Sequence, residues 1–238
     1  DGVSLNSYVV KGDKTALIDL VRDWDEAPMK LRDQLASIPA DLKAIDYLVL
    51  NHLEPDHTGW LGTFRDICPR AEIVTTAKGA ALVKSFYGIE DRVRIVKSGD
   101  TIDLGAGRKL VFEEIPNVHW PETMVTYEPG AGVLFSCDAF GSYGSVGAEV
   151  FDDELSAARH EFFERETLRY YANIVASFSV FVERAIAKLA GLTINVVAPS
   201  HGILWRKNPG IIVDRYKRYA AYAKGPAEAE IAFVWGSM

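Results

Sequence analysis

The chain has 238 residues, of which 48% are hydrophobic and 25% charged, and its formal net charge is −7. No apolar run approaches the roughly 18 residues of a membrane span, no secretory signal opens the chain, and clustered Lys and Arg are missing, which excludes a nucleic-acid surface. We therefore expect an ordinary globular cytoplasmic protein with no membrane or nucleic-acid partner, in which Cys68 and Cys137 are buried thiols rather than a disulfide framework.

The first half of the chain alternates short strands and helices. Apolar and β-branched runs flank the turn pair Gly12-Asp13 and predict a hairpin. The compact run YLVL at 47–50 predicts a strand that is covered on both faces. The expected strands of this half are 7–10, 15–20, 47–50, 72–75 and 93–96, and the expected helices are 31–40, about 59–68, and 77–87.

The second half begins with strands, predicted at 101–104, 109–115, 124–127 and 132–136. Asp152 and Asp153 are N-cap candidates for a long helical region that reaches Ala190, where Gly191 fits the C-terminal stop. A buried strand over 194–198 and a helix over 211–223 follow. This order predicts an α/β (α+β) fold in which two mixed sheets pack together with helices outside.

The predicted domain covers residues 1–223. Lys224-Gly225-Pro226 is typical of a linker, because Gly and Pro interrupt the preceding helix. The last segment, EIAFVWGSM, is a strand running into a Gly/Ser turn, which is how nucleotide and flavin domains begin. A tail strand added to the existing sheet is the alternative.

Seven residues of types that bind hard transition metals lie in four short blocks, each where a predicted strand runs into a loop. Four of the five histidines are among them. In NHLEPDH, Pro55 is expected to prevent a regular helix or ladder, so that alternate residues splay around one point, while His57 faces another direction and could reach a second ion. The seven candidates are His52, Glu54, Asp56 and His57, then His119 in PNVHW, Asp138 in FSCDAFG and His201 in APSHG.

Each of the last three blocks alone is more typical of a structural residue: a packed histidine at His119, a turn or cap at Asp138, and a helix start at His201. Taken together, four imidazoles and three carboxylates without a thiolate suit iron or manganese, although zinc accepts the same set. Asp138 is suited to bridge two ions, since a carboxylate has two oxygens. The clustered negative charge favours a higher oxidation state of iron.

Three aromatic residues flank these blocks: Trp120, Tyr143 and Trp205. They could line a substrate pocket, but such aromatics are more often core or rim packing.

The ordered set of seven residues resembles the metallo-β-lactamase-like domain of flavodiiron proteins, and so do the contexts VHWPETM, SCDAFGSYG and PSHG. Glu54 stands where hydrolases of the same superfamily usually have histidine. The resemblance implies an αββα sandwich with a non-haem centre of two iron ions. It assigns His52, Glu54 and His119 to one iron, Asp56 and His201 to the other, and Asp138 to the bridge; the histidine matching His57 is a ligand in some members only.

The resemblance also implies reduction of dioxygen to water or of nitric oxide to nitrous oxide. Electrons would come from a rubredoxin-like donor through FMN, in a head-to-tail homodimer. The FMN belongs to a flavodoxin-like domain, and residues 224–238 are expected to be a linker and its truncated first strand. Two other functions stay open: a zinc-dependent hydrolase of the same fold and a non-catalytic diiron sensor.

Overall fold

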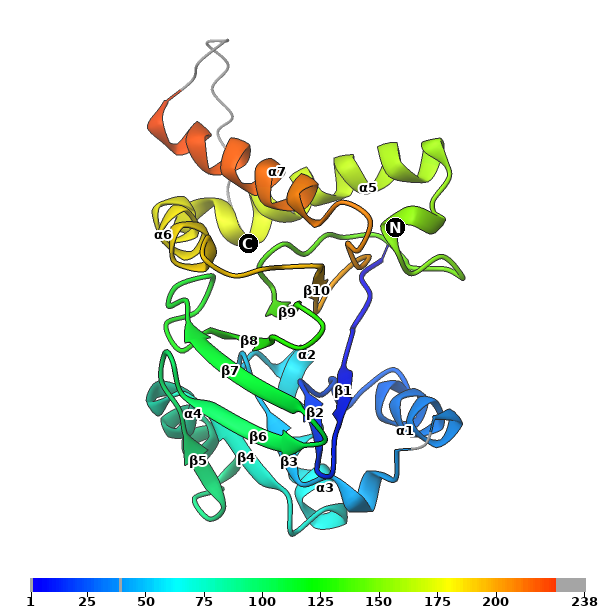
Figure 1. Cartoon of the computed structure of the whole chain (residues 1–238), viewed down its shortest axis with the longest axis vertical. Coiled ribbons are helices and arrows are strands. Elements are labelled where there is room, and N and C mark those ends of the chain that lie inside the picture. Colours follow the sequence, from blue (N-terminus) through cyan, green and yellow to red (C-terminus); the bar gives the residue numbers. More distant parts are fainter. Residues whose placement is uncertain (1, 39, 226–238) are drawn as a thin grey trace.

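Two five-stranded mixed sheets pack face to face in the computed structural model, which describes residues 2–38 and 40–225 (Figure 1). The strand order is β1-β2-β3-β4-β5 in the first sheet and β10-β9-β8-β7-β6 in the second. The expected α/β fold with two mixed sheets is confirmed, whereas the strand expected at 230–238 lies outside the described residues. The strands are β1 (Tyr8–Lys11), β2 (Thr15–Ile18), β3 (Tyr47–Val49), β4 (Glu72–Thr75), β5 (Val93–Ile95), β6 (Thr101–Gly105), β7 (Arg108–Glu114), β8 (Met124–Glu128), β9 (Val133–Cys137) and β10 (Val196–Pro199).

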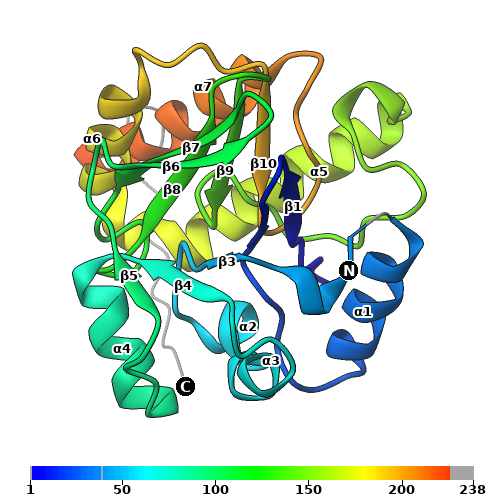
Figure 2. The same cartoon turned by 60° about the horizontal axis from the view of Figure 1, so that its bottom comes forward.

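Helices cover the outer face of each sheet. Helices α1, α3 and α4 lie against the first sheet and α5, α6 and α7 against the second (Figures 1 and 2). The helices are α1 (Ala27–Ser37), α2 (Pro55–Thr58), α3 (Leu61–Ile67), α4 (Ala77–Tyr87), α5 (Ala157–Tyr170), α6 (Ser179–Leu189) and α7 (Pro209–Ala221).

The core has three layers, because side chains alternate between the two faces of each strand. In β2, Leu17 packs toward the helices, while Ala16 and Ile18 pack between the sheets. In β9, Leu134 packs under the helices of the second sheet and Phe135 faces the first sheet. This alternation gives the expected order of helices, sheet, sheet and helices.

Strand directions bring four connections to one edge of the sandwich. Strands β2 to β5 are parallel, and so are β9 and β10, which therefore end at the same side. Strand β8 runs antiparallel to β9, with Thr126 opposite Phe135, so β8 starts near the end of β9. The segments after β3, β7, β9 and β10 consequently meet, and these segments carry the candidate metal ligands.

One prediction for this edge is wrong in detail. Pro55 does not keep the NHLEPDH block from becoming helical; it is the first residue of α2. Proline is favourable there, because the first helical N–H has no intrahelical partner in any case. Asp56 and His57 therefore lie on a short helix, whereas His52 and Glu54 precede it.

The long helical region predicted from Asp152 to Ala190 is also different. Ser156, rather than Asp152 or Asp153, caps α5 by accepting the Arg159 N–H at 3.3 Å. A π-helical turn at 171–175 and a 3₁₀ turn at 176–178 separate α5 from α6, which ends at Leu189. Asp152 is instead buried and accepts three backbone N–H groups, from Arg206, Lys207 and Asn208.

Other element boundaries differ by a few residues from those expected; α1, for example, begins at Ala27 rather than at 31. Cys68 and Cys137 are buried free thiols, as predicted. None of the helices among the described residues has the length and apolar character needed to span a bilayer.

Candidate metal centre

Asn51 fixes the backbone just before the His52 block and ties the two sheets together. It is 1% exposed, its N–H donates to Asp19 Oδ1 at 2.8 Å, and its carbonyl accepts the Met124 N–H of β8 at 2.9 Å. Its side-chain oxygen accepts the Thr126 hydroxyl at 2.7 Å. The residues that follow Asn51 are therefore held at a defined distance from the second sheet.

The structure brings all seven predicted ligands together. Their donor atoms form two groups, and within each group all donor atoms lie within 4.8 Å of one another. The first group is His52, Glu54, His119 and Asp138, and the second is Asp56, His57 and His201.

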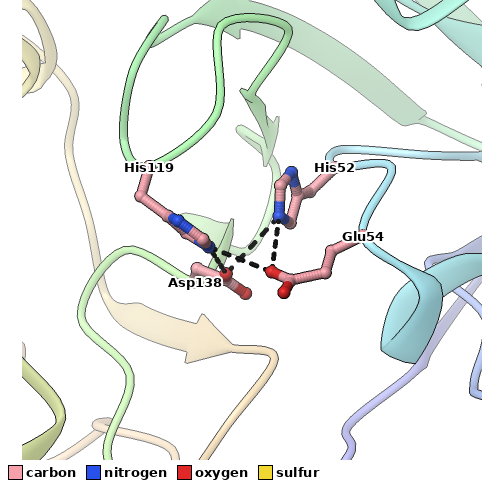
Figure 3. A group of neighbouring side chains, drawn as sticks. All are labelled: His52, Glu54, His119 and Asp138. Atoms are coloured by element: carbon pink, nitrogen blue, oxygen red, sulfur yellow. Dashed lines mark hydrogen bonds and ion pairs between the residues drawn. The ribbon is translucent and has the colours of Figure 1, made fainter. Parts of the chain in front are cut away.

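Figure 3 shows the first group, in which the side chains converge from three segments. Glu54 Oε2 lies 3.3 Å from His52 Nε2 and 3.1 Å from His119 Nε2. Asp138 Oδ2 lies 3.0 Å from His119 Nε2 and 3.7 Å from His52 Nε2. Two imidazole nitrogens and two carboxylates thus face a common point.

The second group lies on the other side of Asp138. Asp138 Oδ1 is 2.9 Å from His57 Nε2 and 3.4 Å from His201 Nε2. Asp56 Oδ2 is 3.4 Å from His201 Nε2. His57 Nε2 and Asp56 Oδ1 are buried and lie 3.5 Å apart, and neither their contact nor that of His57 Nε2 with Asp138 has hydrogen-bond geometry. Buried polar atoms without well-formed hydrogen bonds are costly, so these two atoms fit a site for a cation.

Asp138 therefore serves both groups with different oxygens: Oδ2 faces His52 and His119, and Oδ1 faces His57 and His201. The side chain is 3% exposed. This is the arrangement expected of a carboxylate that bridges two cations.

Acceptors behind two of the imidazoles fix which ring nitrogen faces the centre. His52 Nδ1 lies 2.8 Å from Glu122 Oε1, and His201 Nδ1 lies 2.7 Å from the Ser4 carbonyl. An ionised carboxylate or a carbonyl can only accept, so each Nδ1 carries a proton and donates. When such a ring is neutral, its lone pair is therefore at Nε2, toward the centre.

The carboxylates also change the proton affinity of the imidazoles. Burial alone would lower the pKa of each ring, but hydrogen bonds to carboxylates outweigh burial. They raise the pKa of His52 to about 10, of His119 to about 9 and of His201 to about 10. Cations could replace these protons, since both stabilise clustered negative charge.

The pKa values of the carboxylates shift in the opposite direction. Hydrogen bonds from His119 and His52 lower the pKa of Glu54 to about 2. Burial would raise the pKa of Asp138, but the charge of His57 and hydrogen bonds from the surrounding histidines hold it well below its ordinary value. Both groups are therefore ionised and able to bind a cation at neutral pH.

The centre opens to solvent along two of its carboxylates. The Glu54 side chain is 37% exposed and that of Asp56 is 28% exposed, whereas His52 and His57 are enclosed. Phe178, in the 3₁₀ turn before α6, lies beside His119 with ring centroids 6.3 Å apart. Glu54 and Asp56 are therefore the donors with the most contact with solvent on this side.

The flanking aromatics have different positions. Trp120 stands edge-on to His52, with ring centroids 4.9 Å apart. Tyr143 packs against Tyr170, whose ring lies 5.8 Å from His201. Trp205 is 2% exposed and belongs to the core of the second sheet, so it is a packing residue.

Sequence reasoning missed Glu122 and Asp19, the buried acids behind the ligands. Glu122 lies three residues after His119, and Asp19 directly follows the apolar strand TALI. A lone acid at the end of a buried strand is the signal that could have identified Asp19.

Asp19 and Cys137 form a third possible donor group with His57. Burial raises the pKa of the Asp19 carboxyl and of the Cys137 thiol, which favours their protonated forms. Metal ligands are deprotonated, so this third group is a poorer site than the other two.

Comparison with known proteins agrees with this geometry. The sequence matches a family described as ODP family beta lactamase over residues 3–202. It is 38% identical to an anaerobic nitric oxide reductase flavorubredoxin of Vibrio vulnificus over 240 residues, which cover 100% of this chain and 47% of that protein.

Two solved structures have the same fold. The rubredoxin oxygen:oxidoreductase of Desulfovibrio gigas aligns with a TM-score of 0.85 and 35% identity over 92% of this chain and 54% of that one. A variant of the flavo di-iron protein of Thermotoga maritima aligns with a TM-score of 0.84 and 32% identity over 92% and 53%. The chain spans about half the length of the curated relatives it matches.

Proposed function

This chain belongs to the ODP beta-lactamase family, and from that premise we propose that its seven clustered residues hold two iron ions that reduce a small diatomic molecule. The proposed reactions are reduction of nitric oxide to nitrous oxide and of dioxygen to water. The names of the relatives support this choice, since one is a nitric oxide reductase and another an oxygen oxidoreductase.

The observation that carries the proposal is the division of Asp138 between two donor groups. We assign His52, Glu54 and His119 to one iron, and Asp56, His57 and His201 to the other, with Asp138 between them. His57 is included because its Nε2 is buried and lies 2.9 Å from Asp138 Oδ1, without the geometry of a hydrogen bond. Nitrogen and carboxylate donors without a thiolate suit iron.

Two ferrous ions bound there would supply the two electrons that convert two nitric oxide molecules and two protons into nitrous oxide and water. For dioxygen they would supply two of the four electrons needed for reduction to two waters. Glu122 and the Ser4 carbonyl keep the imidazole Nε2 atoms aimed at the centre throughout. Holding the donors in place in this way avoids reorganisation during turnover.

The source of electrons is part of the proposal. We propose that FMN in a flavodoxin-like domain passes electrons from a rubredoxin-like donor to the two irons. Residues 224–238 would lead into that domain. The protein would act as a head-to-tail homodimer in the cytoplasm. The words flavorubredoxin and rubredoxin in the names of two relatives support the donor and the flavin.

A single-turnover experiment tests the reaction without a flavin. The 238-residue chain is loaded with ferrous iron under anaerobic conditions, freed of unbound metal, and mixed with excess nitric oxide. Iron analysis and gas chromatography should give two irons per chain and about one nitrous oxide per two irons. The matched control is His160→Ala, which removes the one histidine outside the centre and should change neither value.

Two results would contradict the proposal in different ways. Two tightly bound zinc ions together with hydrolytic activity would favour a hydrolase of the same fold. Two bound irons that take up nitric oxide without releasing nitrous oxide would favour a sensor.

A further inference from the structure

A fourth acid, Glu122, lies directly behind the centre and belongs to neither donor group. Its side chain is 0% exposed, and Oε1 lies 2.8 Å from His52 Nδ1. Figure 3 shows one nitrogen of the His52 ring directed toward Glu54 and Asp138, and the other directed away from them. Glu122 contacts the second of these nitrogens.

The surroundings hold the Glu122 carboxylate rigidly. The Leu53 N–H also donates to Oε1, at 3.1 Å, and the Thr76 hydroxyl donates to the Glu122 backbone carbonyl at 3.0 Å. The second carboxylate oxygen, Oε2, is buried without a hydrogen bond. A fully buried carboxylate is unfavourable unless it is paired, and the partner of this one is the imidazole of His52.

His201 has a different partner in the corresponding place. Its Nδ1 lies 2.7 Å from the Ser4 backbone carbonyl, which carries no net charge. A charged acceptor pulls the Nδ1 proton more strongly than a neutral one and makes Nε2 more electron-donating. His52 and His201 are therefore inequivalent ligands, although both face the shared Asp138.

We infer that Glu122 is a positioning residue that acts through His52 and makes the His52 imidazole a stronger electron donor than the imidazole of His201. The inference rests on the proposed diiron centre, and it adds which ligand is tuned and by which residue. It makes the iron held by His52 harder to reduce than that iron would be without the Glu122 charge.

Glu122 could instead be purely structural, since it also accepts the Leu53 N–H. Glu122→Gln separates the two roles. Glutamine has nearly the same shape and its side-chain oxygen can still accept from His52 and Leu53, but its charge is gone. A merely structural residue would leave the electronic properties of the iron unchanged in this variant.

The experiment uses the 238-residue chain loaded with ferrous iron enriched in ⁵⁷Fe. Iron affinity is measured by competition with a chelator, the two reduction steps by spectroelectrochemistry, and the two iron environments by Mössbauer spectroscopy. In Glu122→Gln we expect roughly 10- to 100-fold weaker binding of one of the two irons. One of the two reduction steps should move to a higher potential, and one Mössbauer doublet should shift.

Glu128→Gln is the matched control. Glu128 is also a buried glutamate, with a side chain that is 3% exposed. It lies at the opposite end of β8, where it accepts the Gly130 and Ala131 N–H groups and pairs with Arg108. Loss of this buried charge should leave both iron affinities and both potentials unchanged. A second variant, Glu122→Asp, keeps the charge but shortens the side chain, and should weaken one iron while shifting its potential less than Glu122→Gln does.

Failure of this inference differs from failure of the diiron proposal. If the unmodified chain binds two irons and Glu122→Gln binds both with unchanged affinity and unchanged potentials, the positioning role is wrong and the diiron centre stands. If the unmodified chain binds no iron, the diiron centre itself is wrong. If Glu122→Gln does not fold, Glu122→Asp decides: unchanged affinity for both irons would overturn the role.

Discussion

The two donor groups on either side of Asp138 differ in how well they satisfy their own polar atoms. In the first group, Glu54 accepts from both His52 and His119. In the second, His57 Nε2 and Asp56 Oδ1 are buried without a hydrogen bond. Hydrogen bonds to Glu54 therefore join the first group, whereas ion-pair contacts of 2.9 to 3.4 Å hold the second. The two groups should respond differently to metal removal and to mutation.

The largest expected effect comes from removing what the groups share. Asp138→Ala should lose both irons, because each group is left without its bridging oxygen and its remaining donors are held apart. Elemental analysis after anaerobic loading should fall from two irons per chain to none. Retention of two irons would show that Asp138 does not bridge.

A smaller effect, the loss of one iron, should separate the two groups. His119→Ala removes a donor of the first group only, and His201→Ala one of the second only. Each variant should retain about one iron per chain, with a different Mössbauer doublet remaining in each case. Equal spectra from the two variants would mean that the groups do not act as separate positions.

The smallest expected effect is a gradual loss of the stability of the metal-depleted protein as the pH rises. In metal-depleted protein the folded-state pKa values of His52, His119 and His201 are about 10, 9 and 10, above the ordinary value of 6.5. Their contribution to folding is then fully present below pH 6.5 and is lost as the pH rises through 9 to 10. The melting temperature of depleted protein should fall over that range.

Metal binding should show the opposite trend, since metals bind neutral imidazoles and displace these protons. Iron affinity should rise between pH 7 and 9, and the gap in melting temperature between loaded and depleted protein should widen. Differential scanning fluorimetry of both forms measures this gap. A gap that narrows with rising pH would rule out proton displacement at these histidines.

Much of this centre could be predicted from the sequence. The His52 block is a local pattern. His119, Asp138 and His201 were predicted because each is a polar residue that follows a strand, and the ends of neighbouring strands meet at one edge. The mixed sheets followed from the order of strands and helices in the same way. Elements with strong periodicity were therefore predicted, with boundaries displaced by a few residues.

Other features depend on contacts between distant segments and could not be predicted from the sequence. Asp152 has the residue type of an N-cap, but tertiary hydrogen bonds to the backbone of 206–208 determine its place. Glu122 is one acid among many until the fold puts it 2.8 Å from His52 Nδ1. The orientation of His57 toward Asp138 likewise exists only once both sheets are packed.

The origin of the donors in both sheets has a consequence for biosynthesis. The ribosome makes His52 to His57 together with the first sheet, but His201 only after the strands of both sheets. Iron that arrives before then would meet an incomplete set of donors on a nascent chain. The full set of donors proposed to bind iron therefore exists only after His201 has been made, and cells that supply iron after synthesis should yield as much loaded protein as cells that supply it throughout.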